Sequence, residues 1–254
     1  MPHQRTIWLI VVGAWIILAL ICRVLSRAPR PEGDWAIAWL IVVVYSKLLH
    51  RLKVIGRENI PKAKRESDGV SVSSEAIGVG PLIIVCNHTA GVDPLLVQAV
   101  CPFDMRWMML REMMLPAFSR LWKWIGVIPV DLNGRDSTSL RAALRHLETG
   151  GVIGIFAEGG LEQPHRTINP YLPGVGLLAL KSRAPILPVA IEGTPNCKRA
   201  YPSLFMPSHS VMRFLPVREY QGRGQSAADI AQALEAETAA ALDWPRSSAK
   251  GADA

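Results

Sequence analysis

From Pro81 onward, short apolar runs typical of strands alternate with longer stretches of helical periodicity. We expect strands at residues 82–86, 127–130, 152–156, 186–191 and 211–215. We expect helices at residues 94–100, around 111–124, and at 137–148, 175–182 and 227–242. This order predicts an α/β fold whose central sheet, mostly parallel or mixed, is covered by helices.

The N-terminus carries an uncharged apolar run over residues 7–22, which Val24 and Leu25 extend beyond Arg23. A helix of that length is close to what is needed to cross about 30 Å of hydrocarbon. Basic residues follow the run and an Ala-x-Ala cleavage site is not evident, so we interpret it as an uncleaved membrane anchor rather than a signal peptide.

A second apolar stretch, residues 35–45, is too short to span a membrane and continues to Leu52 with amphipathic character. It is predicted to lie at the membrane interface, with a tilted second span as the alternative. Residues 62–80 are typical of a flexible insertion. We therefore divide the chain into a membrane anchor (1–50), a globular domain (51–245) and a loose tail (246–254), which makes an N-terminal membrane-anchoring helical segment part of the expected fold.

The formal net charge of +7 favours an anionic partner, either phospholipid headgroups or nucleic acid. No nucleic-acid-binding motif is present, and arginines flank the apolar segments, so membrane lipids are the predicted partner and nucleic acid is not. The four cysteines have no spacing that indicates a zinc site or a disulfide framework. Cys86 ends an apolar run, where a small buried cysteine is commoner than a nucleophile.

The most informative stretch is residues 83–94, where a strand-like run leads into Asn87 and His88 and then into Asp93 and Pro94. Pro94 suits the first position of a helix. His88 is therefore expected on the turn between strand and helix, at an end of the sheet where sites often form. Asp93 can either fold back toward the imidazole, so that the pair removes a proton from an alcohol, or serve only as a helix cap.

Asn87-His88 followed by Asp93-Pro94 resembles the HxxxxD signature of the glycerol-3-phosphate and 1-acylglycerol-3-phosphate (lysophosphatidic acid) O-acyltransferase superfamily. Three further blocks of that superfamily follow in order. Residues 124–131 resemble the second block, residues 155–160 the third and residues 184–191 the fourth. The resemblance covers residues 51–219.

The resemblance implies roles for particular residues of this chain. His88 would be the general base and Asp93 its orienting partner. Glu158, with Gly159 and Gly160, would belong to the acceptor site, and Pro188 would shape the acyl side. The reaction would need no metal and no cofactor, with acyl-CoA or acyl-carrier protein as co-substrate.

Two positions depart from the superfamily pattern. The second and third blocks usually carry arginines suited to the phosphate of the acceptor, and here those positions hold Leu132 and Leu161. Arg135 and Arg166 lie close by in the sequence and are candidates to reach the same space, although each can equally be a solvated surface arginine.

Two other features have open interpretations. His165 lies in a polar loop without a partner at metal-ligand spacing, and we interpret it as a loop residue. The Trp-rich and Met-rich stretch from Trp107 to Trp124 either contacts membrane or acyl chain, or forms a core helix packed on the sheet.

The sequence thus predicts a membrane-bound acyltransferase on the cytoplasmic face of the inner or plasma membrane. It would transfer a fatty acyl group from a thioester to a hydroxyl of a lysophospholipid-like acceptor, as in phospholipid biosynthesis. The missing arginines leave open a non-phosphate acceptor, such as a lyso-aminolipid or a lipid alcohol. A catalytically silent lipid-binding relative and a thioester hydrolase are the rivals from other classes, and the absence of a GxSxG elbow disfavours a serine hydrolase.

Overall fold

The computed structural model describes residues 12–13, 15–16, 18–23, 25, 28–29, 33–62, 79–131, 137–197, 199–222 and 224–247. The predicted anchor at 7–22 is therefore only partly described, since residues 7–11, 14 and 17 lie outside these ranges, as do residues 63–78 of the expected insertion. Within the described part of the chain, no helix combines the length and the apolar composition that crossing a membrane requires.

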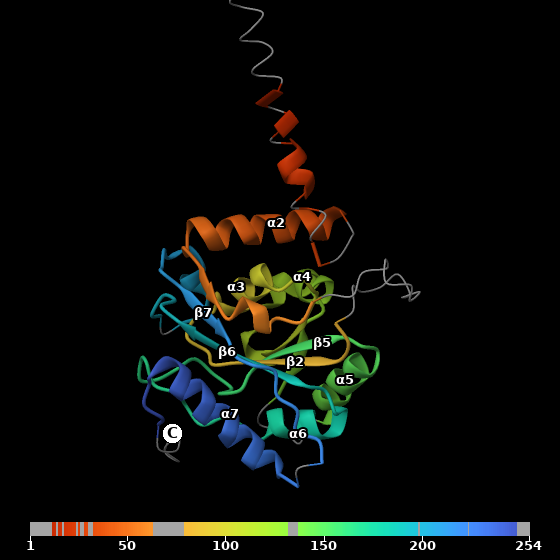
Figure 1. Cartoon of the computed structure of the whole chain (residues 1–254), viewed down its shortest axis with the longest axis vertical. Coiled ribbons are helices and arrows are strands. Elements are labelled where there is room, and N and C mark those ends of the chain that lie inside the picture. Colours follow the sequence, from red (N-terminus) through yellow and green to blue (C-terminus); the bar gives the residue numbers. More distant parts are fainter. Residues whose placement is uncertain are drawn as a thin grey trace, which may run out of the picture.

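A seven-stranded sheet forms the centre of the molecule (Figure 1). Its strands lie in the order β1 (Lys53–Ile55), β7 (Val211–Phe214), β6 (Ile186–Glu192), β2 (Leu82–Cys86), β5 (Val152–Phe156), β3 (Arg106–Leu110) and β4 (Ile128–Val130). All neighbouring pairs are parallel except β6 and β7. The predicted mostly parallel sheet is thus confirmed, with its antiparallel step near one edge.

Helices cover both faces of the sheet (Figure 1). One face carries α3 (Asp93–Val100) and α4 (Ser119–Trp124), and the other carries α5 (Ser137–Glu148), α6 (Gly174–Ser182) and α7 (Ala227–Leu242). The described residues also form short 3₁₀ helices: η1 (Arg57–Asn59), η3 (Arg111–Met113), η4 (Pro116–Phe118) and η5 (Tyr201–Phe205). Sheet and helices therefore form the layered α/β arrangement expected from the alternating sequence pattern.

Burial on both faces explains why β2 is apolar throughout. Ile83 and Val85 belong to the core beneath α5, α6 and α7, whereas Ile84 and Cys86 belong to the core beneath α3. Successive side chains of a strand point to opposite faces, so a strand covered on both sides needs an unbroken apolar run. Cys86 is fully buried in this strand, as the sequence suggested.

Of the helix predicted around residues 111–124, only α4 forms as an α-helix, so one of the two interpretations of the stretch from Trp107 to Trp124, a core helix, is wrong. Residues 106–110 form β3, with Trp107 packed in one core and Met108 in the other, and the following residues form η3, η4 and α4 in place of one continuous helix. The alternation of faces is invisible in the sequence because both faces are apolar. β1 is also absent from the predicted strands, because three residues are too few for a periodic signal.

Helix α2 (Gly33–Leu48) lies over α3 as an outer layer (Figure 1). Its inner face buries Trp35 and Trp39, and the indole N–H of Trp39 donates to the carbonyl oxygen of Gln98 on α3 at 3.2 Å. The outer face leaves four apolar side chains exposed, Ile37, Ile41, Val44 and Leu48. Helix α2 therefore packs on α3 with its inner face and presents an apolar surface on its outer face.

The C-terminal residues that the structure describes are held to the domain. The N–H of Ser247 donates to the carbonyl oxygen of Ile168 at 2.9 Å, and Arg246 pairs with Ile168 in an isolated bridge. Arg246 and Ser247, which the sequence assigned to a loose tail (246–254), are thus held to the domain, and residues 248–254 lie outside the described ranges.

Candidate active site

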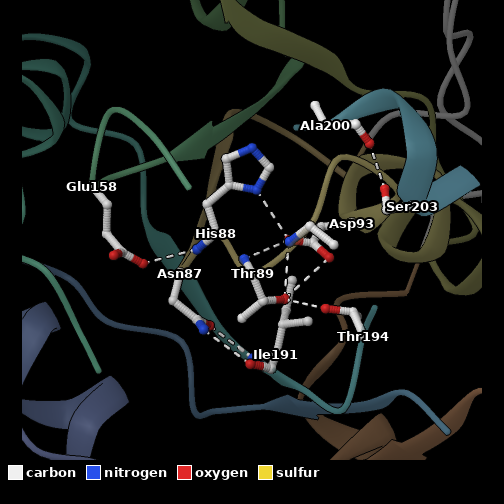
Figure 2. A network of polar contacts seen from close by, with 10 residues as sticks. Asn87, His88, Thr89, Asp93, Glu158, Ile191, Thr194, Ala200 and Ser203 are labelled. Carbon is white, nitrogen blue, oxygen red and sulfur yellow. Dashed lines mark hydrogen bonds and ion pairs between the residues drawn. The ribbon is translucent and has the colours of Figure 1, made fainter. Parts of the chain in front are cut away.

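The site is built on the turn of residues 87–92, which links the carboxyl end of β2 to α3 and is called here the His88 turn (Figure 2). Asn87 fixes its start. The side chain of Asn87 accepts from the N–H of Ile191 at 2.8 Å and donates to the carbonyl oxygen of the same residue at 2.9 Å. An amide side chain thereby extends the pairing of β2 with β6 by one step, and it sets where the polypeptide leaves the sheet.

The carboxylate of Asp93 is fully buried and bends back into the His88 turn. Its Oδ2 accepts from the backbone N–H groups of Thr89 and Ala90 at 2.8 and 2.9 Å and from Nδ1 of His88 at 3.0 Å. No side chain caps α3, which excludes the alternative that Asp93 serves only as a helix cap. A buried carboxylate with several donors is a fixed negative charge beside the imidazole.

The contact with Asp93 indicates which ring nitrogen of neutral His88 carries the proton. With Nδ1–H donated to a carboxylate, Nε2 is left with its lone pair available as a proton acceptor. The ring is stacked on Phe156, with centroids 4.0 Å apart, and Phe156 is stacked in turn on Trp107 at 4.9 Å. Bonding at one nitrogen and stacking on one face hold the imidazole in a single orientation.

His88 lines a cavity of about 1250 Å³. This exceeds the roughly 300–1,000 Å³ that is usual for small-molecule sites, and most of the lining side chains are apolar. The walls come from α2, α3, β3, α4 and α6, and from the segment that follows β5. His88 is therefore placed at the wall of a space suited to long apolar chains.

Glu158 follows β5 and is buried behind the His88 turn rather than in the cavity lining. Its two carboxyl oxygens accept from the backbone N–H of His88 at 2.9 Å and from that of Asn169 at 3.0 Å (Figure 2 shows the first contact). Burial raises the pKa of Glu158 from 4.5 to about 8, although the two N–H donors lower it in part. Glu158 thus ties the His88 turn to the loop that contains Asn169.

The loop after Glu158 is held against the same turn. The N–H of Glu162 donates to the carbonyl oxygen of His88 at 2.8 Å, and a carboxyl oxygen of Glu162 accepts from Nδ1 of His165 at 2.6 Å. Burial raises the pKa of Glu162, and the donors Arg166 and His165 oppose this rise. Across the described ranges, no cluster of three or more His, Cys, Asp or Glu side chains is arranged to hold a metal ion.

The remaining residues singled out from the sequence fall in different places. Gly159 and Gly160 line the cavity, and Gly159 adopts φ +69°, a conformation that favours glycine. Pro188 is buried in β6 opposite Val85 and does not line the cavity. The guanidinium of Arg166 lies over the ring of Trp244 at 5.9 Å, and Arg166 is not part of the lining either. Arg135 and Leu132 lie outside the described residues.

Sequence reasoning missed the segment after β6 as part of the site. The hydroxyl of Thr194 contacts that of Thr89 at 2.5 Å, and Gly91 packs against the backbone of Ala200 so closely that a Cβ on Gly91 would lie 2.4 Å from the Ala200 oxygen. Because β6 is parallel to β2, the carboxyl ends of both strands meet at one edge. The contact between the segment after β6 and the His88 turn follows from the pairing of β2 with β6, which the sequence alone does not reveal.

Comparison with known proteins agrees with this geometry. A family model described as Acyltransferase matches residues 51–192, a range that includes the His88 turn and Glu158. The chain is 27% identical over 127 residues to the 1-acyl-sn-glycerol-3-phosphate acyltransferase of Bacillus subtilis (strain 168). That alignment covers 47% of this chain and 59% of the relative, so the chain spans well under two thirds of the relative's length.

The fold has a counterpart among solved structures. The crystal structure of the 1-acyl-sn-glycerophosphate (LPA) acyltransferase, PlsC, from Thermotoga maritima is similar with a TM-score of 0.63 at 19% identity. The similarity covers 96% of this chain and 97% of that one, and at this identity it shows the fold alone. Because the family model matches more than half of the sequence, the chain belongs to the acyltransferase family.

Proposed function

We propose that this protein transfers a fatty acyl group from a thioester, acyl-CoA or acyl-carrier protein, to a hydroxyl of a lysophospholipid. The observation that carries the proposal is the oriented pair of His88 and Asp93 at the wall of a large apolar cavity. Membership of the acyltransferase family and the similarity to a relative named for acylating 1-acylglycerol-3-phosphate support the same reaction.

The proposed step begins with the acceptor hydroxyl at Nε2 of His88. The hydroxyl oxygen attacks the thioester carbonyl carbon while Nε2 takes its proton, and Asp93 stabilises the imidazolium that forms. The tetrahedral intermediate then collapses, the carbon–sulfur bond breaks, and the leaving thiolate takes the proton back from His88. The products are an ester and a free thiol, and no covalent acyl-enzyme is needed.

Residues around the base would serve the two substrates differently. The apolar cavity would hold acyl chains and keep water from the thioester, whose hydrolysis competes with transfer. Gly159 and Gly160 leave the wall beside His88 free of side chains, so a substrate can approach the backbone there. Glu158 would act as a positioning residue, because both of its oxygens hold backbone rather than face the cavity.

Association with a membrane surface forms part of the proposal. The exposed apolar face of α2 lies over a cavity that α2 itself helps to line through Trp35 and Trp39. Lys47, near the end of α2, and Arg51 just beyond it provide positive charge beside that face. An interfacial helix with these properties would place the cavity next to the bilayer from which both acyl chains come.

The test compares the wild type with His88→Ala, using labelled palmitoyl-CoA or palmitoyl-acyl-carrier protein and a mixed extract of membrane lipids. His209→Ala is the matched control, because His209 is exposed and contacts Arg51. We expect a labelled phospholipid with the wild type and the control, and a loss of at least roughly a hundredfold with His88→Ala. Free palmitate in place of a lipid product would indicate a hydrolase, and no product from either donor would indicate a catalytically silent relative.

A further inference from the structure

The cavity has an uneven charge distribution. Among the described residues that line it, Arg199 is the one Lys or Arg, and the carboxyl-bearing residues are Glu112 and Asp131. Leu161, at a position where the superfamily pattern has an arginine, lines the cavity as an apolar residue. A negatively charged headgroup in this cavity therefore has one described side chain that can neutralise it.

Arg199 is brought to the cavity by a segment fixed on both sides. Before it, Thr194 contacts Thr89 of the His88 turn at 2.5 Å. After it, the backbone of Ala200 packs against Gly91, and the hydroxyl of Tyr201 donates to the carbonyl oxygen of Met113 at 2.5 Å. Figure 2 shows Thr194 and Ala200 beside the turn that carries His88 and leads into Asp93. Arg199 thus directly precedes a residue that packs against the His88 turn, and it lines the same cavity as His88.

The side chain of Arg199 is available for a ligand. It is exposed, and within the described ranges its guanidinium has no hydrogen bond or ion pair with another residue. Arg166, the other described arginine considered from the sequence, stacks on Trp244 instead. A guanidinium at the wall of a cavity that His88 also lines suits a phosphate group, which can accept two parallel N–H bonds from it.

We propose that Arg199 binds the phosphate group of the acceptor and so determines that the enzyme prefers a phosphate-bearing lysolipid to a neutral one. This inference deepens the proposed function and rests on it for the identity of the reaction. It also assigns to the segment after β6 the phosphate-binding role for which Leu132 and Leu161 are unsuited.

The test replaces Arg199 by Gln and, separately, by Lys. Arg111→Gln is the matched control, because it removes one positive charge between two cavity-lining residues, Leu110 and Glu112, without itself lining the cavity. The transfer assay compares lysophosphatidic acid with monoacylglycerol, which has the same chain and a hydroxyl but no phosphate. Binding of both lipids is measured separately through the fluorescence of tryptophans in the cavity wall, such as Trp107 and Trp124.

For Arg199→Gln we expect KM and Kd for lysophosphatidic acid to rise roughly ten- to a hundredfold, as for loss of a hydrogen-bonded charge contact, with values for monoacylglycerol nearly unchanged. Arg199→Lys should fall between wild type and Arg199→Gln, and Arg111→Gln should match the wild type. Equal rises for both lipids, or an unchanged Kd for lysophosphatidic acid, would overturn the proposal.

The binding measurement separates this inference from the proposed function. If the wild type transfers no acyl group but binds lysophosphatidic acid in an Arg199-dependent manner, the phosphate site stands and the proposed function fails. If the wild type acylates lysophosphatidic acid and Arg199→Gln does so with the same KM, the proposed function stands and the phosphate site fails.

Discussion

Asp93 concentrates the polar organisation of the site on one oxygen atom. Its Oδ2 accepts from the backbone N–H groups of Thr89 and Ala90 and from Nδ1 of His88. Among the described residues, Oδ1 has only the hydroxyl of Thr89, which lies 3.3 Å from each of the two oxygens. Because of this asymmetry, a side chain with a single oxygen at the position of Oδ2 can keep the hydrogen bonds of the turn without a negative charge beside the imidazole. An asparagine can keep its oxygen at the position of Oδ2 and place its NH₂ next to the Thr89 hydroxyl, which can accept a hydrogen bond.

For Asp93→Asn we therefore expect a folded protein with little activity. The turn keeps its acceptor, but the negative charge that stabilises the imidazolium is lost. The rate of acyl transfer should fall roughly a hundred- to ten-thousand-fold, while the urea midpoint of unfolding changes little. Substantial residual transfer in a folded variant would show that His88 does not need the charge of Asp93.

For Glu158→Gln we expect lower stability, because an amide has one oxygen for the two backbone N–H groups of His88 and Asn169. Leaving one buried donor unpaired costs about 1–3 kcal/mol of the free energy of unfolding. The pKa of Glu158 is raised to about 8 in the folded state, so its contribution to stability is fully present below 4.5 and is lost as pH rises through about 8. The glutamine does not titrate.

The difference in the free energy of unfolding between the wild type and Glu158→Gln should accordingly become smaller as pH increases. Urea unfolding of both proteins at about pH 5 and about pH 8.5 measures this difference across the window set by the two pKa values. A difference that stays constant between these two pH values would mean that Glu158 is ionised in the folded protein over the whole range, and would contradict the raised pKa.

At the scale of elements, α2 is firmly attached on one side and open on the other. His50, just beyond its end, is buried between the hydroxyl groups of Tyr45 and Ser208, and Tyr45 also donates to the carbonyl oxygen of Leu204 at 2.5 Å. Burial lowers the pKa of His50, which favours its neutral form. These contacts join the end of α2 to η5, whose Phe205 is 83% exposed.

The orientation of α2 against a bilayer can be tested with a fluorescent label. In a background with Cys22 and Cys197 replaced by Ser, an environment-sensitive label is placed on Ile37→Cys, on the outer face of α2. The matched label is on Ala236→Cys, exposed on α7 across the sheet. With vesicles of anionic phospholipid we expect the emission of the Ile37 label to shift to shorter wavelength as the label leaves water, and that of the Ala236 label to stay constant. Equal behaviour of the two labels would contradict an interfacial α2.

At the scale of the whole molecule, the sequence predicts what depends on local pattern. Doubly buried strands such as β2 and β5 are visible as unbroken apolar runs, and His88 and Asp93 are close in the sequence as well as in space. Two features of the structure could not be predicted from the local sequence pattern, each for a physical reason. Trp107 and Met108 hide the period of β3 because both faces of the sheet are apolar. Thr194 and Ala200 meet the His88 turn because β6 pairs with β2, and this pairing is not visible in the sequence.

The position of β1 at the edge of the sheet has a consequence for the order of events during synthesis. Its strand partner is β7, with Lys53 opposite Val211, so the two segments are separated by most of the domain. A ribosome that has released α2 and β1 must still make the residues up to Phe214 before β1 can pair. Helix α2 is thus made long before the sheet is complete, so the proposed contact of α2 with lipid can precede closure of the fold during translation.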